Sequence, residues 1–481
     1  MKHNRQYILS KTPYLIDSSW SSLRMRNGYT LSFQQNLRVQ PNEDQSVVLV
    51  GDAWQADPVR KTPFEILRQW NSNTTLEEIY EQEESWSGRY IIITNRYVLT
   101  DTTSQLACFY TDHAVSSSIA LLQYILGEES LVLPPKEMLI QGKTMPGPLT
   151  PHCKIRRLLC LQVLDYQMFM TVVCGGRSML FGMPRNTGHN LEDFEKAFFY
   201  SIEQMYKHYE NYEVWFGLSG GKDSRTGLAA LEKLKKDYHL YVFRDKHSQY
   251  AGCYADYALA RLLSKKVHKK LLVIHRNINA YNSKRAQEFE EHTAGMIANI
   301  SSKWMYNEDS LRPIRQRANR ILLIRNNIWE IVSDFYAGSI DTSDKLRAEW
   351  KGMGMIVEES IEEWLRIVAE DKLNTSLSLS ERAYWELRDG CWCSDGLQSM
   401  DIYESIEMVN ILNCRRFLRL LMGLDLETRR KRLYQVTLTN QWCPDFADIP
   451  YGNQYIDVYI LLERLFRKVK KNVVKYFDLI K

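Results

Sequence analysis

The 481-residue sequence lacks any run of eighteen apolar residues, so it predicts no transmembrane helix. The first twenty residues are basic but contain no apolar stretch long enough for a signal peptide. Both absences predict a cytoplasmic protein.

The sequence also lacks a strong excess of charge of either sign. Sixty-two Lys and Arg residues stand against fifty-eight Asp and Glu residues, which leaves a formal net charge of +4. A dedicated nucleic-acid binder usually has a larger or more segregated excess, so we expect no nucleic-acid partner. The apolar share of 44% and the charged share of 25% are those of a folded soluble protein, which excludes a disordered or collagen-like chain.

Cysteine is sparse and scattered. The nine cysteines include no CxxC pair, and Cys391 and Cys393 form a lone CxC. This distribution argues against a disulfide scaffold and against a zinc–thiolate site. We expect reduced and mostly buried thiols.

The first 180 residues or so show the pattern of antiparallel strands. Short β-branched or aromatic runs alternate with turns, and Asn95-Arg96 between two of them is typical of a hairpin connection. We therefore predict a mostly antiparallel layer here. The strand-like runs are 47–50, 90–94, 97–100, 107–110, 158–165 and 168–174.

The pattern changes near residues 185–192. A helical spacing of apolar residues over 191–208 is followed by alternating strands and helices, which predicts a doubly wound parallel sheet. From about residue 355 nearly everything is predicted to be helical. Because the chain exceeds the ~250–300 residues of one ordinary core, we predict an α/β protein with two domains, 1–188 and 189–481. The expected strands are 213–218, 239–244, 271–275 and 321–325, and the expected helices are 225–236, 253–265 and 284–300.

The last residues, 455–481, form an amphipathic and basic segment. One interpretation is contact with a membrane surface or a polyanion. The other is a terminal helix that docks by its apolar face and exposes its lysines to solvent.

The segment Leu218-Ser219-Gly220-Gly221-Lys222-Asp223-Ser224 follows an apolar strand and enters a helix. Two glycines allow a tight backbone, and serines with free N–H groups at a helix start favour a phosphate. Asp223 in such a loop requires a divalent cation between its carboxylate and the phosphates. The segment is not a Walker A loop, because that motif has Ser or Thr directly after its lysine. A plain strand-to-helix turn with glycines is the alternative.

The motif SGGKDS resembles the pyrophosphate loop of ATP pyrophosphatases, which include asparagine synthetase, β-lactam synthetase and tRNA-modifying adenylases. Residues 86–90, 97–111 and 114–122 look like the glutaminase-type (Ntn-type) domain of asparagine synthetases. Residues 325–330 and 335–336 resemble that family's second acidic loop, with Glu330 where the family has a metal-binding aspartate. Further resemblance to its C-terminal section involves Tyr384-Trp385-Glu386, Arg388, Asp401 and Ile449-Pro450.

Two features depart from that family. The glutaminase nucleophile is an N-terminal cysteine, whereas residues 1–3 are Met-Lys-His and the first cysteine is Cys108. The acidic loop also lacks its usual glycines, with Asn326 and Ile328 near their places. The sequence thus looks most like relatives with an inactive glutaminase domain: β-lactam synthetase, carbapenam synthetase and the lasso-peptide macrolactam cyclases.

The resemblance implies an AMP-forming amide ligase that uses ATP and Mg²⁺ but not glutamine. Its substrates would be a carboxylate and an amine, for example in a peptide, and partner proteins of a biosynthetic cluster are conceivable. We expect Asp223 and Glu330 to hold the metal, and Lys222 to add a charge. Lys431 is the candidate cation for the reacting carbonyl, although a solvated charge run over 429–432 is the alternative. The expected nucleotide-binding residues are Leu218, Ser219, Gly220, Gly221, Ser224, Val242, Phe243 and Arg325.

Two other functions stay open at this point. One is a catalytically reduced pseudo-enzyme that acts as a binding subunit, which the changed acidic loop favours. The other is a tRNA- or nucleobase-modifying adenylase, which would be marked by a basic groove, an RNA-binding appendage or CxxC cysteines.

Overall fold

The computed structural model describes residues 4–128, 135, 137–138, 144–172, 187–244, 252–275, 308–370 and 377–452. The helix predicted over 284–300 and the amphipathic segment 455–481 lie outside these residues.

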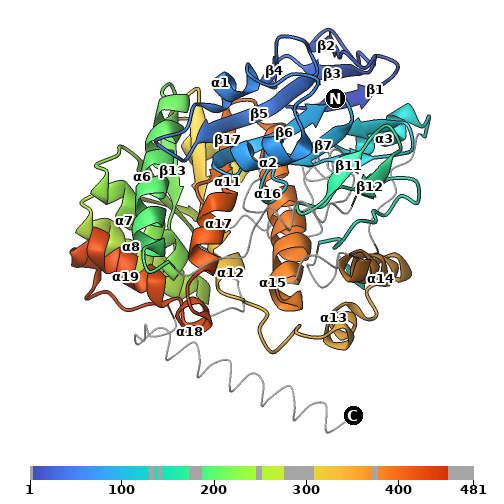
Figure 1. Ribbon diagram of the computed structural model, residues 1–481. Helices are drawn as coiled ribbons and strands as arrows, with labels where there is room; N and C mark the ends of the chain where they lie inside the picture. Colours follow the sequence, from blue (N-terminus) through green and yellow to red (C-terminus); the bar gives the residue numbers. More distant parts are fainter. Residues whose placement is uncertain are drawn as a thin grey trace.

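The N-terminal part contains two six-stranded antiparallel sheets, seen at the top of Figure 1. The antiparallel prediction is confirmed, but the strands form two sheets rather than one layer. One sheet has the order β10-β8-β9-β1-β3-β2 and the other β12-β11-β7-β6-β5-β4. The strands are β1 Tyr7–Ser10, β2 Trp20–Arg24, β3 Thr30–Gln34, β4 Val39–Pro41, β5 Val47–Gln55, β6 Trp86–Thr94, β7 Tyr97–Thr100, β8 Phe109–Tyr110, β9 Ala114–Ser116, β10 Arg156–Arg157, β11 Val163–Asp165 and β12 Met170–Val172.

The two sheets pack face to face through the apolar side chains of alternate strand positions. Tyr7 and Leu31 from one sheet share a buried core with Val50 and Ile91 from the other. Residues that point the opposite way, such as Leu49, pack under helices α1 and α2, while α3 covers the outer face of the first sheet. The result is a four-layer arrangement. The covering helices are α1 Pro63–Leu67, α2 Leu76–Glu83 and α3 Ile119–Ile125.

Local sequence signals account for several of these elements. Thr62 and Thr75 each form a capping box with a glutamate three residues later, which starts α1 and α2. The hairpin predicted at Asn95-Arg96 joins β6 to β7, with Ile93 paired to Val98.

The second part is built on a five-stranded sheet with the order β15-β14-β13-β16-β17. All its neighbouring strands are parallel, which confirms the predicted parallel sheet. Helices cover both faces, with α6, α7 and α8 on one and α11 on the other. The elements are α6 Asn190–His208, β13 Glu213–Gly217, α7 Lys222–Lys233, β14 His239–Arg244, α8 Gly252–Lys266, β15 Leu271–His275, α11 Glu308–Arg315, β16 Ile321–Arg325 and β17 Ile406–Asn410.

Among the described residues after β16, the regular elements are helical except for β17, in line with the helical prediction from about residue 355. This strand was not predicted because it is a single five-residue run between helical segments. Its partner is β16, more than eighty residues earlier, so no local alternation marks it. The helices are α12 Trp329–Val332, α13 Ser343–Trp350, α14 Met355–Glu370, α15 Leu379–Ala383, a π-helix Tyr384–Cys393, α16 Ser394–Gln398, a 3₁₀ turn Ser399–Ile402, α17 Arg415–Met422, α18 Leu426–Arg430, α19 Leu433–Trp442 and a 3₁₀ turn Pro444–Phe446.

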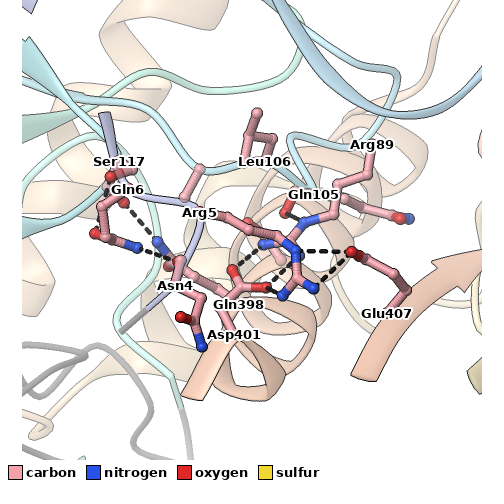
Figure 2. A network of polar contacts seen from close by, with 12 residues as sticks. Asn4, Arg5, Gln6, Arg89, Gln105, Leu106, Ser117, Gln398, Asp401 and Glu407 are labelled. Carbon is pink, nitrogen blue, oxygen red and sulfur yellow. Dashed lines mark hydrogen bonds and ion pairs between the residues drawn. The ribbon is translucent and has the colours of Figure 1, made fainter. Parts of the chain in front are cut away.

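A buried polar network joins the antiparallel sheets to the C-terminal part (Figure 2). Arg89 on β6 donates to both carboxylate oxygens of Asp401, at 2.7 and 2.5 Å. Arg5 donates to Asp401 at 3.2 Å and to Glu407 on β17 at 2.8 Å. Two cations and two anions therefore pair where β6 and β17 meet.

None of the described helices is long and apolar enough to cross a lipid bilayer.

Candidate functional site

The segment Leu218–Ser224 lies between β13 and α7, in the strand-to-helix turn where the sequence predicts it. In the strand order of the sheet, β13 has β14 on one side and β16 on the other. The chain winds outward from β13 in both directions, so the strand order reverses between β13 and β16. Ligands of open parallel sheets bind outside the carboxyl ends of the strands at such a point.

Two glycines permit close packing around this turn. A Cβ atom on Gly220 would lie 2.5 Å from a side-chain carbon of Leu259 in α8. A Cβ atom on Gly227 would lie 2.4 Å from the side-chain oxygen of Asn326, which follows β16. Gly227 therefore brings α7 against the segment that carries Glu330.

The two serines of the loop bond to each other and to the loop backbone. Their hydroxyl oxygens are 3.0 Å apart, and the Ser219 N–H donates to Ser224 Oγ at 3.1 Å. The Gly221 N–H donates to Ser219 Oγ at 3.3 Å, and the Gly220 N–H donates to Asp256 of α8 at 2.9 Å. These are the N–H groups that a phosphate would require, and here protein oxygens accept their hydrogen bonds.

Asp223 and Glu330 both face the guanidinium of Arg432. Arg432 donates to Asp223 at 3.3 and 3.5 Å and to Glu330 at 3.5 Å. Gln435 donates to Asp223 at 2.7 Å, and the Tyr384 hydroxyl donates to Glu330. Burial raises the pKa of the Asp223 carboxyl to about 6, although the Arg432 charge opposes this shift.

The structure thus brings the two predicted metal ligands to one place, from α7 and α12. Within the described residues no group of three His, Cys, Asp or Glu side chains is arranged to hold a metal. Two carboxylates are nevertheless a fitting protein contribution for Mg²⁺, which commonly takes its other ligands from nucleotide phosphates and water.

The two predicted lysines differ in position. Lys222 points toward the chain before α19, where its ammonium donates to the Lys431 carbonyl oxygen at 2.8 Å. Burial and the Arg432 charge lower the pKa of Lys222. The Lys431 side chain lies on the surface and pairs with Glu427 one turn earlier, at 2.6 Å. The cation that faces the carboxylates is the next residue, Arg432.

Arg432 was missed because a run of four basic residues does not reveal which side chain turns inward. Arg432 has a left-handed backbone (φ 54°, ψ 38°) where α19 begins, between Lys431 outside and Gln435 inside. The sequence did contain a sign of this cation in the basic run Arg429-Arg430-Lys431-Arg432. Interpreting the run as a solvated charged face hid the inward position of Arg432.

Four of the residues predicted to bind the nucleotide lie toward the carboxyl ends of β13, β14 and β16. The Leu218 N–H donates to the Tyr241 carbonyl at 2.9 Å, which places Leu218 beside the end of β14. Leu218 and Val242 belong to the core on one face of the sheet, whereas Phe243 packs on the opposite face. Arg325 ends the neighbouring strand β16, and its Nε donates to Asn327 at 3.1 Å.

Sequence reasoning also missed Asp389, a buried residue of the π-helix. Neither of its carboxylate oxygens has a hydrogen-bond partner among the described residues. Burial and the charge of Glu330 raise the pKa of Asp389 well above its usual range. A π-helical segment is rare and often marks a functional region, and this one also supplies Tyr384 to Glu330.

The first cysteine of the sequence, Cys108, lies inside the N-terminal core with 1% of its surface exposed. Burial raises the pKa of this thiol to about 12. A buried neutral thiol is not a nucleophile.

No protein-family model matches this chain, and a search of curated proteins finds no match.

Proposed function

We propose that this protein is an ATP-dependent, AMP-forming amide ligase that couples a substrate carboxylate to an amine without glutamine. The observation that carries the proposal is the convergence of SGGKDS and Glu330 at the carboxyl ends of β13 and β16. Asp223 and Glu330 come from separate segments, yet both contact the Arg432 guanidinium.

In the proposed reaction, an oxygen of the substrate carboxylate attacks the α-phosphorus of ATP and pyrophosphate leaves. The amine nitrogen then attacks the acyl carbon, and AMP leaves. The amide forms this way because a carboxylate does not react directly with an amine at a useful rate, whereas AMP is a good leaving group.

The protein's own residues would bind and orient the nucleotide. The N–H groups of Ser219, Gly220 and Gly221 would exchange their present protein acceptors for pyrophosphate oxygens, and Ser224 would add a hydroxyl donor. Asp223 and Glu330 would hold Mg²⁺, which neutralises charge that develops on the departing pyrophosphate. Lys222 belongs to the loop, and its ammonium would add a positive charge by leaving the Lys431 carbonyl oxygen that it now contacts.

The N-terminal part, in this proposal, is a glutaminase-like (Ntn-type) domain without glutaminase activity, and residues 189–481 form the synthetase domain. The first cysteine of the N-terminal part, Cys108, is buried with a raised thiol pKa, so this residue is not a nucleophile. The amine would then come from the substrate itself or from a second substrate, as in a peptide macrolactam or a modified small metabolite.

The test is ATP–pyrophosphate exchange with a panel of carboxylates, followed by product analysis. AMP, pyrophosphate and a product lighter by one water, or a condensed pair, are expected. Release of ADP and phosphate would contradict the proposal, because the wrong bond of ATP would be broken.

One observation favours the pseudo-enzyme as a second candidate. The Gly220 N–H is bonded to Asp256, and Arg432 neutralises the two carboxylates, so both the phosphate loop and the metal ligands have protein partners. A pseudo-enzyme would show no exchange with any carboxylate, and neither nucleotide nor pyrophosphate would bind.

A further inference from the structure

Arg432 contacts both carboxylates that the proposed function assigns to a metal. Its NH1 lies 3.3 Å from Asp223 Oδ1, and its NH2 lies 3.5 Å from Glu330 Oε1. One guanidinium therefore spans two side chains that come from α7 and α12. A divalent cation bound to the same two oxygens would have to share this space with the guanidinium.

These contacts are longer than those of the buried pairs Arg89–Asp401 and Arg429–Glu381. Arg89 lies 2.5 Å from Asp401, and Arg429 lies 2.7 Å from Glu381. Charge-assisted N–H···O bonds usually measure about 2.7–2.9 Å. The side chains of Arg432, Asp223 and Glu330 are also 20%, 21% and 30% exposed, so water reaches this pair of contacts. Arg432 is thus weakly held, and a stronger ligand can displace it.

The left-handed backbone conformation that places Arg432 at this position is energetically unfavourable. Left-handed φ is uncommon for residues other than glycine, asparagine and aspartate. The residues that follow fix α19 against α7, since Thr226 bonds to Thr439 at 3.0 Å and Gln435 bonds to Asp223. The guanidinium is therefore directed to one region, between the carboxylates and the start of α7.

We propose that Arg432 is an internal counter-ion that exchanges ligands when the nucleotide binds. Without a nucleotide it occupies the cation position between Asp223 and Glu330. With the nucleotide present, it leaves the carboxylates to a divalent cation and binds the pyrophosphate portion beside Ser219–Gly221. This inference rests on the proposed function, because it takes the loop as the pyrophosphate site.

The exchange predicts opposite effects on two ligands when the charge of Arg432 is removed. Without the guanidinium, the two carboxylates repel each other and attract a divalent cation more strongly. A pyrophosphate, in contrast, loses a charge-assisted hydrogen-bond donor. If Arg432 had a merely structural role, its replacement would weaken the binding of both ligands or of neither.

The experiment measures two affinities on the full-length protein, with no organic substrate. Binding of Mn²⁺ alone is followed by electron paramagnetic resonance of the free ion, and binding of inorganic pyrophosphate in EDTA by calorimetry. Arg432→Gln should bind Mn²⁺ several-fold more tightly and pyrophosphate about tenfold to a hundredfold more weakly. Arg432→Lys should retain most of the pyrophosphate affinity, because it keeps the charge.

Two further variants separate the charge from the fold. Arg430→Gln removes a neighbouring arginine that pairs with Asp334 at 2.7 Å, and it should match the unsubstituted protein for both ligands. Arg432→Gly removes the charge and suits the left-handed backbone, so it should reproduce Arg432→Gln without loss of thermal stability.

The proposal would be overturned if Arg432→Gln weakened the binding of Mn²⁺ and of pyrophosphate equally, or changed neither affinity. So would failure of every variant to bind Mn²⁺ and pyrophosphate. If the opposite shifts occur but no carboxylate supports ATP–pyrophosphate exchange, the ligand exchange stands and the ligase function fails.

Discussion

Asp401 is the acceptor that holds two buried arginines at the junction of the antiparallel sheets and the C-terminal part. It receives hydrogen bonds from Arg89 at 2.5 and 2.7 Å and from Arg5 at 3.2 Å, and its side chain is 2% exposed. Together with Glu407 it balances the two positive charges (Figure 2). Asp401→Asn keeps the size of the side chain but leaves this buried cluster with one uncompensated positive charge.

The expected loss in the free energy of unfolding is about 3–5 kcal/mol, the usual range when one partner of a buried ion pair is removed. The new amide NH₂ would also face an Arg89 donor, so at least one hydrogen bond is lost. The control is Glu362→Gln, because Glu362 pairs with Arg347 on the surface with half of its side chain exposed. An exposed pair contributes about 0–1 kcal/mol.

The assay is urea unfolding followed by far-UV circular dichroism and by tryptophan fluorescence, since coincident curves identify a single cooperative transition. The double variant Arg89→Met with Asp401→Leu removes one charge of each sign and should be more stable than Asp401→Asn. An Asp401→Asn midpoint equal to that of Glu362→Gln would refute the reasoning.

Three other predictions follow from the candidate site and the core. Asp223→Asn should lower ATP–pyrophosphate exchange by about a hundredfold to a thousandfold, because the metal stabilises the transition state by several kcal/mol. The circular dichroism spectrum should stay unchanged. Glu330→Gln should lower the exchange rate as well, but by less. The purified protein should release no glutamate from glutamine, with or without ATP, since the Cys108 thiol is buried and its pKa is raised to about 12; steady glutamate release would contradict this. Burial raises the pKa of Asp395 from 3.8 to about 7 despite its pairing with Arg157, so the folded state holds the proton more tightly than the unfolded state. Stability should therefore fall as pH rises from about 4 to 7 and then level off, and urea midpoints of Asp395→Asn should lack this part of the slope.

The parallel sheet could be predicted because its information is local. Strands β13, β14, β15 and β16 are apolar runs separated by helical spacings, and the loop after β13 contains its own glycines and serines. Such features need only neighbouring residues. Strand β17 contains Glu407 and Asn410 and pairs across a helical region, so only the tertiary structure identifies it.

Charged residues of the site were harder to assign for a related reason. Sequence reasoning identified Asp223 and Glu330 from a motif and a resemblance, and the structure places them near each other. Sequence reasoning selected Lys431 instead of Arg432. A shift of one position along the chain changes whether a side chain faces solvent or the interior, and the run of basic residues does not show which position faces inward. Arg89 and Asp401 were each noted separately, yet they are 312 residues apart and nothing in the sequence pairs them.

In the proposed ligase, this pairing gives the N-terminal domain a structural role. Gly88, Arg89 and Asp101, in the segments where the sequence predicts a glutaminase-type domain, all bond to the C-terminal part. Asn413 donates to the Gly88 carbonyl at 2.6 Å and to the Asp101 carboxylate at 2.9 Å, both of which are buried.

Neighbouring contacts continue the same junction. The Trp385 indole donates to the Thr102 carbonyl at 2.8 Å, so the turn after Asp101 holds the π-helix that carries Tyr384 and Asp389. Tyr384 in turn donates to Glu330 at the candidate site. A chain of direct contacts thus runs from the antiparallel sheets to the carboxylate that Arg432 contacts. In the proposed ligase, these contacts give the N-terminal domain the role of orienting Glu330, because loss of that domain would leave the Trp385 indole N–H without its acceptor.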